Sequence, residues 1–437
     1  MFMENDRIKQ YIMDFQGKDF SSIISRNIEI KPSNKIHTII GPRRTGKTYL
    51  MYKLINDLKV SDINRNQMVY LNFENPLFYD LNFKQIREII ELHWSLFPET
   101  TNKKLHIFID EPQVIKNWEV AIREIYDNFN CHIFITGSSS KLLSKEIATS
   151  LRGRAITTHL LPLSFKEFLK FRKFESNVNK LNTKEKAILS NLFDEYLKFG
   201  GYPEISLEQN ETEKLKILKN YFDLVIYKDL IERYKITNTK LIKWFIDYLI
   251  SSLTKETSIN NVYNTLKSKQ IKISKNTLYD YFSMLEDSFF IFPVRRFDYS
   301  IKNENLSIPK IYLNDHGFLN LFSIEEFGKR IENIVYLELL RKQHINPIQK
   351  INYWKSADNK EVDFIVGEGK NIKQAIQVCY DINDERTKQR EITSLVRCLE
   401  YFKLKEGLII TRNTKSEEKV DGKKIRIIPI IEWLLIK

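Results

Sequence analysis

Two stretches of the chain carry residue types at spacings that suit phosphate chemistry. The first reads GPRRTGKT from Gly41 to Thr48 and fits the pattern Gly-x-x-x-x-Gly-Lys-[Ser/Thr] in full. In such a loop the glycines let backbone N–H groups point at a phosphate, Lys47 reaches the β- and γ-phosphates, and Thr48 offers its hydroxyl to Mg²⁺. The second stretch, LHIFIDEPQ, ends an apolar run with Asp110 and Glu111. Together the two stretches predict a site for a nucleoside triphosphate.

The two carboxylates after this apolar run have separate predicted roles. Asp110 would hold the hydrated Mg²⁺, because a phosphate-binding loop needs a carboxylate at the end of a neighbouring strand. Glu111 stands where it could polarise an attacking water, and this pairing separates enzymes that hydrolyse nucleotides from proteins that only bind them. We therefore predict ATP and Mg²⁺ as cofactors, with Lys47 and Glu111 catalytic and with Thr48 and Asp110 binding the metal.

Polar residues further along the chain are candidates for the γ-phosphate end of the site. In ITGSSSKLL, Ser138 is our first choice for sensing this phosphate or placing the water, with Thr136 the alternative, although the stretch also fits an ordinary helix start. In SLRGR, Arg152 or Arg154 could reach a neighbour's γ-phosphate as a catalytic arginine, or both could be solvated surface residues. The predicted nucleotide-binding residues are Gly41, Pro42, Arg43, Arg44, Thr45, Gly46, Lys47, Thr48, Tyr49 and Ser138.

These residues need a scaffold of alternating strands and helices. Short apolar runs predict buried strands, and helical spacing between them, as in Leu50, Leu54 and Leu58, predicts helices. Strands that alternate with helices imply βαβ crossovers and a mostly parallel sheet covered on both faces, which is an α/β fold. The predicted strands are 35–40, 68–73, 105–110, 131–136 and 155–160.

The remainder of the chain reads as further modules. Residues 164–235 are helical and interrupted by FGGYPE, and residues 240–310 give three helices and then two apolar strands, which is the order of a winged helix. From about 328, a helix, two strands joined by a polar turn, a second helix and two more strands form a small α/β unit. We predict a P-loop core at 1–165, a helical lid at 166–235, a winged helix at 236–325 and a C-terminal domain at 326–437.

The composition is that of a globular protein with an anionic partner. The chain has 437 residues, of which 42% are hydrophobic and 29% charged, and its net charge is +13. This charge favours nucleic acid first and an acidic membrane surface second, while a lysine-rich solvated surface is the alternative. The three cysteines form no C-x-x-C pair, the N-terminus shows no signal region, and no uncharged run approaches the ~20 residues of a membrane-spanning helix. We therefore expect a cytoplasmic protein without a membrane segment.

The joint order of several unusual phrases resembles the AAA+-type P-loop ATPases of archaea and bacteria, in the lineage near the STAND and ORC-like ATPases. The phrases are GPRRTGKT, IFIDEPQ, TGSSSKLLS, LRGR, LPLSFKEF and GGYPE, and the resemblance extends through YKDLIERY, NDHGFLN and IENIVYLELL. It implies an AAA+ parallel sheet with the strand order 5-1-4-3-2, ATP hydrolysis and a winged-helix module. It also implies a terminal domain similar to PD-(D/E)XK nucleases.

In that nuclease superfamily a helix Glu, a strand-end Asp and a Glu-x-Lys on the next strand gather around Mg²⁺. The resemblance places Glu332 or Glu338 on the helix and Asp363 at the strand end. The next strand reads IQVCY, so Gln377 replaces the glutamate and a cysteine replaces the lysine, unless Lys373 substitutes from a shifted position. An active site would bind metal through Glu332, Asp363 and Gln377, but we favour a degenerate domain kept for structure or DNA contact.

The sequence therefore favours an ATPase that acts as a nucleotide-driven switch coupled to DNA binding. The alternatives are an ATP-regulated, metal-dependent DNA endonuclease and a nucleotide-dependent protein-interaction switch that never touches DNA. A homo-oligomer or a protein partner is compatible with each of these three hypotheses. The candidate DNA contacts are the polar residues Lys275, Asn276, Thr277 and Asp280 of the helix after Ser274, and the pair Arg295-Arg296 in the expected wing.

Overall fold

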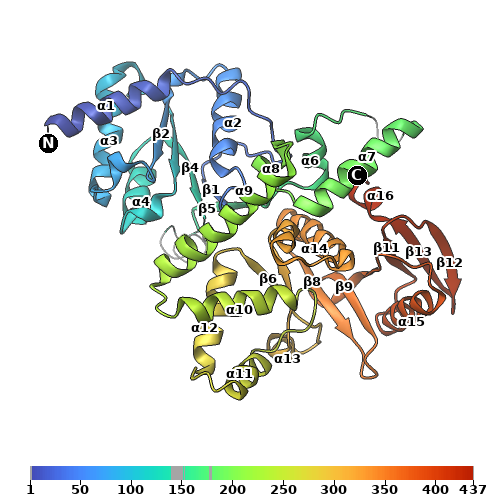
Figure 1. Ribbon diagram of the computed structural model, residues 1–437. Helices are drawn as coiled ribbons and strands as arrows, with labels where there is room; N and C mark the ends of the chain where they lie inside the picture. The colour runs from blue at the N-terminus through green and yellow to red at the C-terminus, as the bar shows by residue number, and fades with distance from the viewer. Residues whose placement is uncertain (1, 139–150, 152, 177–179, 437) are drawn as a thin grey trace. The chain divides into compact units, whose positions relative to one another are not determined.

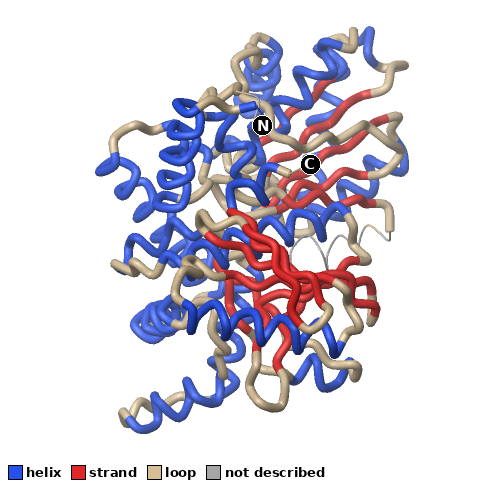
Figure 2. Tube along the Cα trace, turned by 90° about the vertical axis from the view of Figure 1, so that its right-hand side faces the viewer, coloured by secondary structure: helices blue, strands red, loops and turns tan. Residues whose placement is uncertain are grey.

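A five-stranded sheet forms where the sequence predicts alternating strands and helices. Its strands are β1 (Ile36–Ile40), β2 (Met68–Asn72), β3 (Leu105–Asp110), β4 (Cys131–Gly137) and β5 (Ala155–His159). All neighbouring strands are parallel, and their order is β2-β3-β4-β1-β5. This is the expected order 5-1-4-3-2 counted from the opposite edge, so the predicted α/β P-loop sheet is confirmed. Figure 1 shows this sheet among the helices of the first unit, and Figure 2 shows strands in red and helices in blue.

This computed structural model describes residues 2–138, 151, 153–176 and 180–436. The chain divides into two compact units, Met1–Leu161 and Pro162–Lys437. The first unit contains the parallel sheet, and the second contains a helical part and a separate mixed sheet. The finer division into lid, winged helix and C-terminal domain stays a prediction. None of the described helices combines the length and the apolar character needed to cross a membrane.

Apolar strands in the first unit are buried because helices cover both faces of the sheet. Helix α2 (Lys47–Val60) packs Leu50, Met51 and Leu54 against the strand residues Phe108 and Phe134. Helices α3 (Phe83–Leu96) and α4 (Trp118–Asn128) contact each other on the other side of the sheet (Figure 1). The unit also contains α1 (Phe2–Gln16) and the short 3₁₀ turns η1 (Arg65–Gln67), η2 (Pro76–Phe78), η3 (Pro98–Thr100) and η4 (Pro112–Val114).

The second unit begins with a helical part that follows the predicted pattern. Its helices are α6 (Phe165–Phe171), α7 (Thr183–Phe199), α8 (Pro203–Leu207), α9 (Glu211–Leu224), the π-helical turn η6 (Val225–Glu232), α10 (Thr239–Ser251), α11 (Ile259–Ser268) and α12 (Lys275–Asp287). Ser274 caps α12 as expected, since its hydroxyl accepts the backbone N–H of Thr277. Strands β6 (Ile291–Val294) and β7 (Lys310–Leu313) then pair in antiparallel fashion, and the short helix α13 (Ile301–Leu306) between them was not predicted.

The segments GGYPE and NDHG contact each other inside this unit, at the 3₁₀ turn η7 (His316–Phe322). The carboxylate of Asp315 accepts the backbone N–H of Gly201 at 2.7 Å and that of Gly317 at 2.8 Å. Gly200 has a φ of 82°, and a Cβ built on it would lie 1.7 Å from an Asp315 carboxylate oxygen. Glycine is therefore required where the carboxylate contacts the turn.

The C-terminal sheet contains more strands than the sequence predicted. Its order is β12-β13-β11-β10-β9-β8, with α14 (Phe327–Ile345) before it, α15 (Glu385–Tyr401) between β10 and β11, and α16 (Ile430–Leu435) at the end. We expected two strands between 352 and 380, but there are three, because Ser356 bonds Lys360 through both backbone and hydroxyl and turns the chain back. The strands are β8 (Gln349–Lys355), β9 (Glu361–Glu368), β10 (Asn371–Val378), β11 (Glu406–Thr411), β12 (Ser416–Val420) and β13 (Lys423–Pro429).

Candidate functional site

The phosphate-binding loop joins β1 to α2 in a conformation that only glycine permits at two positions. Gly46 has a φ of 91°, and a Cβ on Gly41 would lie 2.1 Å from the carbonyl oxygen of Leu160. The loop delivers the chain to the N-terminus of α2, where Gly46 has no side chain to cap the first N–H groups. Such a helix end attracts anions through its N–H groups and its dipole.

Lys47 lies folded across this loop rather than out in solvent. Its ammonium donates to the carbonyl oxygens of Gly41 at 3.1 Å and Pro42 at 3.0 Å, and it lies 3.6 Å from a carboxylate oxygen of Glu111. The side chain is 6% exposed. A buried ammonium that contacts carbonyls and one carboxylate can exchange these partners for phosphate oxygens.

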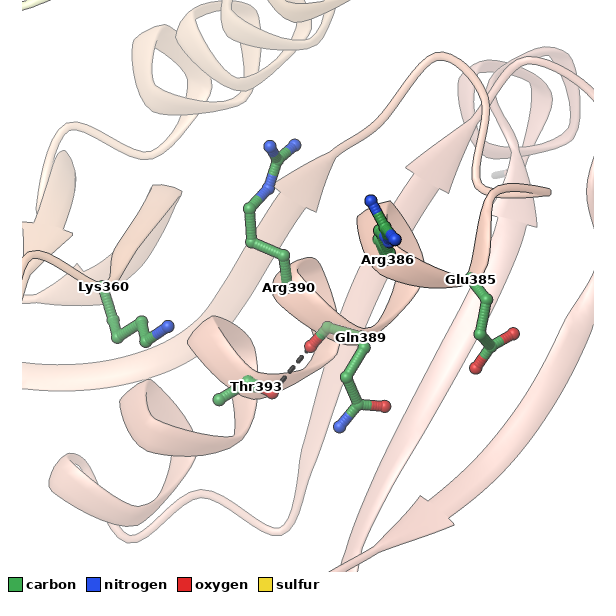
Figure 3. A pocket seen from close by; sticks show the side chains of 6 residues that line it. All are labelled: Lys360, Glu385, Arg386, Gln389, Arg390 and Thr393. Atoms are coloured by element: carbon green, nitrogen blue, oxygen red, sulfur yellow. Dashed lines mark hydrogen bonds between the residues drawn. The ribbon is translucent and has the colours of Figure 1, made fainter.

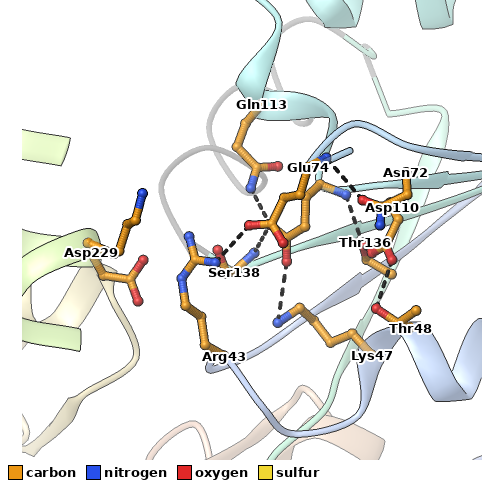
Figure 4. A network of polar contacts seen from close by, with 12 residues as sticks. Arg43, Lys47, Thr48, Asn72, Glu74, Asp110, Gln113, Thr136, Ser138 and Asp229 are labelled. Carbon is orange, nitrogen blue, oxygen red and sulfur yellow. Dashed lines mark hydrogen bonds and ion pairs between the residues drawn. The ribbon is translucent and has the colours of Figure 1, made fainter. Parts of the chain in front are cut away.

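Asp110 is surrounded by hydroxyl groups at the end of β3 (Figure 4). Its carboxylate accepts hydrogen bonds from Thr48 at 2.7 Å, from Tyr70 at 2.9 Å and from Thr136. Burial raises the pKa of Asp110, and the neighbouring charge of Glu111 adds to this, while the three hydroxyls oppose it. The predicted metal-binding pair, Thr48 and Asp110, is thus in direct contact, and its role in binding Mg²⁺ stays a prediction.

Glu111 is held by groups from three segments. One carboxylate oxygen, Oε2, accepts the backbone N–H of Ser138 at 3.1 Å and a side-chain N–H of Gln113, while Oε1 faces Lys47. Burial alone would raise the pKa of Glu111, but the charges of Lys47 and Arg43 and these hydrogen bonds outweigh burial and lower it. The carboxylate is therefore ionised at neutral pH.

Ser138 supplies an unusual feature of this region. Its side chain is buried, its backbone N–H is taken by Glu111, and its hydroxyl has no hydrogen-bond partner among the described residues. A buried polar atom without a partner costs about 1–3 kcal/mol, and in native proteins it calls for an unseen partner or a functional role. A phosphate oxygen or a water would satisfy it, so the residues present fit a bound nucleotide, held by Lys47, Thr48 and the N–H groups of the loop.

The structure gives Arg43 a contact that the sequence did not predict. Its guanidinium donates to Glu74 at 2.8 Å, and its charge acts on Glu111 as described above. Arg44 has a φ of 66°, and Tyr49 is an exposed residue whose ring centroid lies 6.0 Å from that of Tyr52. Arg44 and Tyr49 remain predicted nucleotide contacts without an observed role.

Of the two candidate catalytic arginines, the structure describes the contacts of one. Arg152 lies outside the described residues. Arg154 forms an ion pair with Asp127 of α4 at 3.1 Å, and its guanidinium lies over the ring of Tyr126 at 5.6 Å. A partly exposed arginine in such contacts has the features of a surface residue, and a role across a subunit boundary stays a prediction.

Sequence reasoning missed Tyr70 and Gln113, and it did not predict the contacts that Thr136 makes. Tyr70 lies in an apolar strand, where its hydroxyl gives no sign that it will face Asp110. Thr136 was considered for the γ-phosphate, but it bonds Asp110 and accepts the N–H of Glu111 at 3.2 Å. Gln113 follows Glu111 in DEPQ, and only the backbone turn between them brings the two side chains together.

A second cluster of carboxylates lies in the C-terminal part, where the resemblance implied a metal site. Glu332 on α14 and Asp363 on β9 do come together, but the ammonium of Lys310 on β7 stands between them. It lies 2.9 Å from Asp363, 2.7 Å from Glu361 and 3.6 Å from Glu332, and its side chain is 2% exposed. Burial alone would lower the pKa of Lys310, but these three carboxylates raise it. Burial, followed by the charge of Asp363, raises the pKa of Glu332 to about 8.

The other predicted residues of this cluster are also engaged in hydrogen bonds. Gln377 accepts the backbone N–H of Asp363 at 3.2 Å and donates to Glu391 at 2.6 Å, and Asp363 accepts the N–H of Val378 at 2.9 Å. Glu338, the alternative helix glutamate, pairs instead with Arg341 at 3.3 Å. Across the described chain, no group of three or more His, Cys, Asp or Glu side chains is arranged to hold a metal ion.

The candidate DNA contacts fall into two groups. On α12, Lys275, Asn276 and Asp280 are exposed. Arg295 is instead half-buried, and its guanidinium donates to the carbonyl of Ser307 at 2.9 Å. The backbone after β6 also pairs with β8, because the carbonyl of Arg295 accepts the N–H of Tyr353 at 3.1 Å. Arg296, the other residue of the pair, is exposed, and phosphate contact by this segment stays a prediction.

A shallow depression of about 510 Å³ lies on the surface of the C-terminal part (Figure 3). Its lining comes from α15 and from the turn before β9. None of the site residues predicted from the sequence is among the lining residues, which are Lys360, Glu385, Arg386, Gln389, Arg390 and Thr393.

Three family models match successive parts of the chain. A family model described as an AAA domain matches residues 33–169. Two further models, each described as a domain of unknown function (DUF8612 and DUF4143), match residues 190–327 and 327–433. Among solved structures, the chain is similar to the Aeropyrum pernix ORC1 protein in complex with DNA, with a TM-score of 0.33 at 12% identity over 75% of this chain and 93% of that one. It is similar to C. elegans PCH-2 with a TM-score of 0.29 at 16% identity over 50% and 67%. These TM-scores are too low to support an argument.

Two relatives extend over nearly the whole chain. An uncharacterized protein of Haemophilus influenzae is 29% identical over 93% of this chain and 96% of its own length. The uncharacterized protein MJ1544 of Methanocaldococcus jannaschii is 41% identical over 95% of this chain and 92% of its own length. The chain therefore belongs to the same family as the Methanocaldococcus jannaschii protein MJ1544, and it carries an AAA domain at residues 33–169.

Proposed function

We propose that this chain binds ATP with Mg²⁺, hydrolyses it, and uses the reaction as a conformational switch coupled to DNA binding. The observation that supports hydrolysis best is the pair of neighbouring carboxylates at the end of β3. Asp110 contacts the Thr48 hydroxyl at 2.7 Å, and Glu111 lies 3.6 Å from the ammonium of Lys47. One carboxylate is thus available to a metal ion and the other to a water molecule, at the mouth of a phosphate-binding loop.

The residues of the site divide the chemistry between them. ATP supplies the γ-phosphoryl group, and Mg²⁺ neutralises the negative charge that develops on the phosphate oxygens. Thr48 and Asp110 would hold the metal, while Lys47 would exchange the carbonyls of Gly41 and Pro42 for phosphate oxygens. Glu111, whose pKa is lowered, would accept a hydrogen bond from the attacking water and orient it.

The DNA part of the proposal is supported by the charge around the turn between α11 and α12. Residues 257–279 contain four lysines and no Asp or Glu. Because all four lysines are exposed, this turn and the start of α12 form a basic surface on which phosphates would be bound in a salt-dependent way. The lysines are Lys267, Lys269, Lys272 and Lys275.

The endonuclease alternative is disfavoured by the position of Lys310. A divalent ion between Glu332 and Asp363 would have to displace an ammonium that already pairs with both carboxylates. An ammonium displaced in this way would lose its carboxylate partners inside the protein, which costs several kcal/mol. We therefore do not propose DNA cleavage for this cluster.

One experiment tests hydrolysis and its coupling to DNA in the same tubes. The full chain is incubated with ATP, Mg²⁺ and duplex or single-stranded DNA, and phosphate release and DNA integrity are followed together. We expect turnover that falls at least about 100-fold in Lys47→Ala and in Glu111→Gln. Lys53→Ala, which removes a partly exposed lysine of the same helix that pairs with Asp57, is the matched control and should keep full turnover.

Three outcomes would contradict the proposal. Absence of turnover in the wild type, or equal turnover in Lys47→Ala, removes the hydrolytic function. Turnover without any salt-sensitive DNA affinity removes the DNA partner and leaves a switch that acts on proteins. DNA cleavage that is lost in Asp363→Ala would restore the endonuclease reading.

A further inference from the structure

Gln113 is the residue near the candidate catalytic carboxylate whose position the proposed function does not yet explain. It lies in η4, the 3₁₀ turn that follows β3 directly, and its side chain turns back toward Glu111. This return is possible because Glu111 takes a left-handed conformation, with a φ of 52°, and Pro112 fixes the next residue. A left-handed conformation is uncommon for glutamate, and such local strain gathers at functional sites.

The hydrogen bonds of Gln113 show which of its atoms are satisfied. The amide N–H₂ donates to Oε2 of Glu111, and the amide oxygen is buried without a partner among the described residues. Since an ionised carboxylate can only accept hydrogen bonds, the amide nitrogen must face Glu111 and its oxygen must point elsewhere. The amide is therefore oriented by Glu111 and by no other group that the structure shows.

The two oxygens of Glu111 consequently differ. Oε2 accepts two N–H groups, one from Gln113 and one from the backbone of Ser138 at 3.1 Å. Oε1 has the contact with the Lys47 ammonium at 3.6 Å, which is longer than a hydrogen bond. When Lys47 turns to a phosphate, Oε1 is the oxygen that becomes available, while Oε2 remains fixed.

We propose that Gln113 is a positioning residue for the ATP hydrolysis proposed above, and that it acts by fixing Oε2 so that Oε1 of Glu111 faces the attacking water. In this step the water oxygen forms a bond to the γ-phosphorus, and the bond from the γ-phosphorus to the bridging oxygen breaks with its electron pair remaining on ADP. One water proton passes to Oε1 of Glu111, and the other stays on the phosphate product. Glu111 then returns its proton to solvent.

The inference is tested by Gln113→Leu, which removes the donor and also the unpartnered acceptor. We expect kcat to fall about 10–100-fold, because a misplaced base loses most of its contribution to the reaction. The affinity for the fluorescent analogue mant-ADP should stay within about twofold, and the melting temperature should not fall, because the change also removes a buried acceptor that lacked a partner. Gln67→Leu, which removes a glutamine of the same unit that donates to the Lys104 carbonyl, is the matched control and should keep kcat.

A double-mutant cycle distinguishes positioning from a general structural effect. In the Glu111→Gln background there is no carboxylate to position, so adding Gln113→Leu should change the residual turnover by less than about twofold. Gln113→Lys, which keeps an N–H donor toward Glu111, should recover part of the lost kcat. An unchanged kcat in Gln113→Leu, or an equal loss in both backgrounds, would overturn the inference. If the wild type shows no turnover, the proposed hydrolysis fails instead, and the mant-ADP measurement still reports whether the site binds nucleotide.

Discussion

Two buried groups of carboxylates in this molecule each face one lysine, but the two lysines differ in how many carboxylates they contact. At the phosphate-binding loop, Lys47 contacts Glu111 at 3.6 Å and donates to two backbone carbonyls, and the Ser138 hydroxyl nearby has no described partner. In the C-terminal part, Lys310 contacts three carboxylates within 3.6 Å. The first group has a cation and a hydroxyl to offer to a ligand. In the second group, a buried ammonium already stands among the carboxylates.

The difference teaches that a set of acidic residues on the expected elements does not by itself make a metal site. Glu332 and Asp363 occupy the helix and the strand where the resemblance placed them. The decisive residue is Lys310, which lies 53 positions before Asp363 and comes from another sheet. An internal ammonium gives these carboxylates the positive charge that a metal would otherwise supply.

The largest expected difference between the two groups of carboxylates is in the stability lost when the lysine of each group, Lys310 or Lys47, is replaced. Lys310→Met should lower the free energy of unfolding by about 3–5 kcal/mol, because it leaves buried carboxylates without a cation. Lys47→Met should cost only about 1 kcal/mol, because Glu111 keeps its two N–H donors. Thermal or urea unfolding measures both.

Lys350→Met provides the control for the lysine variants. This lysine is 50% exposed and lies 3.5 Å from Glu304, so its loss should cost no more than about 1 kcal/mol. If Lys310→Met unfolds at the wild-type temperature, Lys310 does not stabilise the carboxylates around it. The two groups of carboxylates would then not differ in how much their lysine contributes to stability.

A smaller effect is expected at Asp315, a buried carboxylate that has N–H donors but no ion pair among the contacts described above. Burial raises its pKa from 3.8 to about 7, against the N–H bonds from Gly201 and Gly317. The folded chain therefore binds this proton more tightly than the unfolded chain. The resulting stability is fully present below pH 3.8 and is lost as the pH rises through 7.

The test of this expectation compares Asp315→Asn with the wild type at each pH from 4 to 8. Other titrating groups, including His316, then cancel in the difference. The variant should gain relative stability as the pH rises, by up to about 4 kcal/mol at about 1.4 kcal/mol per pKa unit. A difference that stays constant across this range would contradict the raised pKa.

The smallest expected effects come from removing one hydroxyl group near each group of carboxylates, that of Ser138 or that of Tyr312. Ser138→Ala removes a hydroxyl without a described partner, so the nucleotide-free protein should lose no stability, while affinity for Mg²⁺·ATP should fall about fivefold, or about 1 kcal/mol. Tyr312→Phe removes the hydroxyl that bonds Glu332 at 2.8 Å and should destabilise the protein by about 1–2 kcal/mol. The melting temperature and nucleotide titration report both, and equal losses of stability would erase the distinction.

Much of the first unit could be predicted from the sequence because its signals are local. The loop Gly41–Thr48 is contiguous, its glycines are required by the backbone, and the strand before it and the helix after it follow from apolar spacing. All five strands lie within one residue of their predicted ends, since buried parallel strands are near-continuous apolar runs. The additional C-terminal strands were missed because they are partly polar and joined by tight turns.

The sequence by itself determined the phosphate-binding loop, the carboxylate pair Asp110-Glu111 and the α/β sheet that carries them, because each depends on neighbouring residues along the chain. The tertiary structure decided which side chains stand against these carboxylates. Tyr70 reaches Asp110 across 40 residues, and Lys310 reaches Asp363 across 53 residues. Charge balance inside a protein depends on such distant contacts. For that reason, only the folded chain shows that hydroxyl groups surround Asp110 in one acidic cluster and that the ammonium of Lys310 stands among the carboxylates of the other.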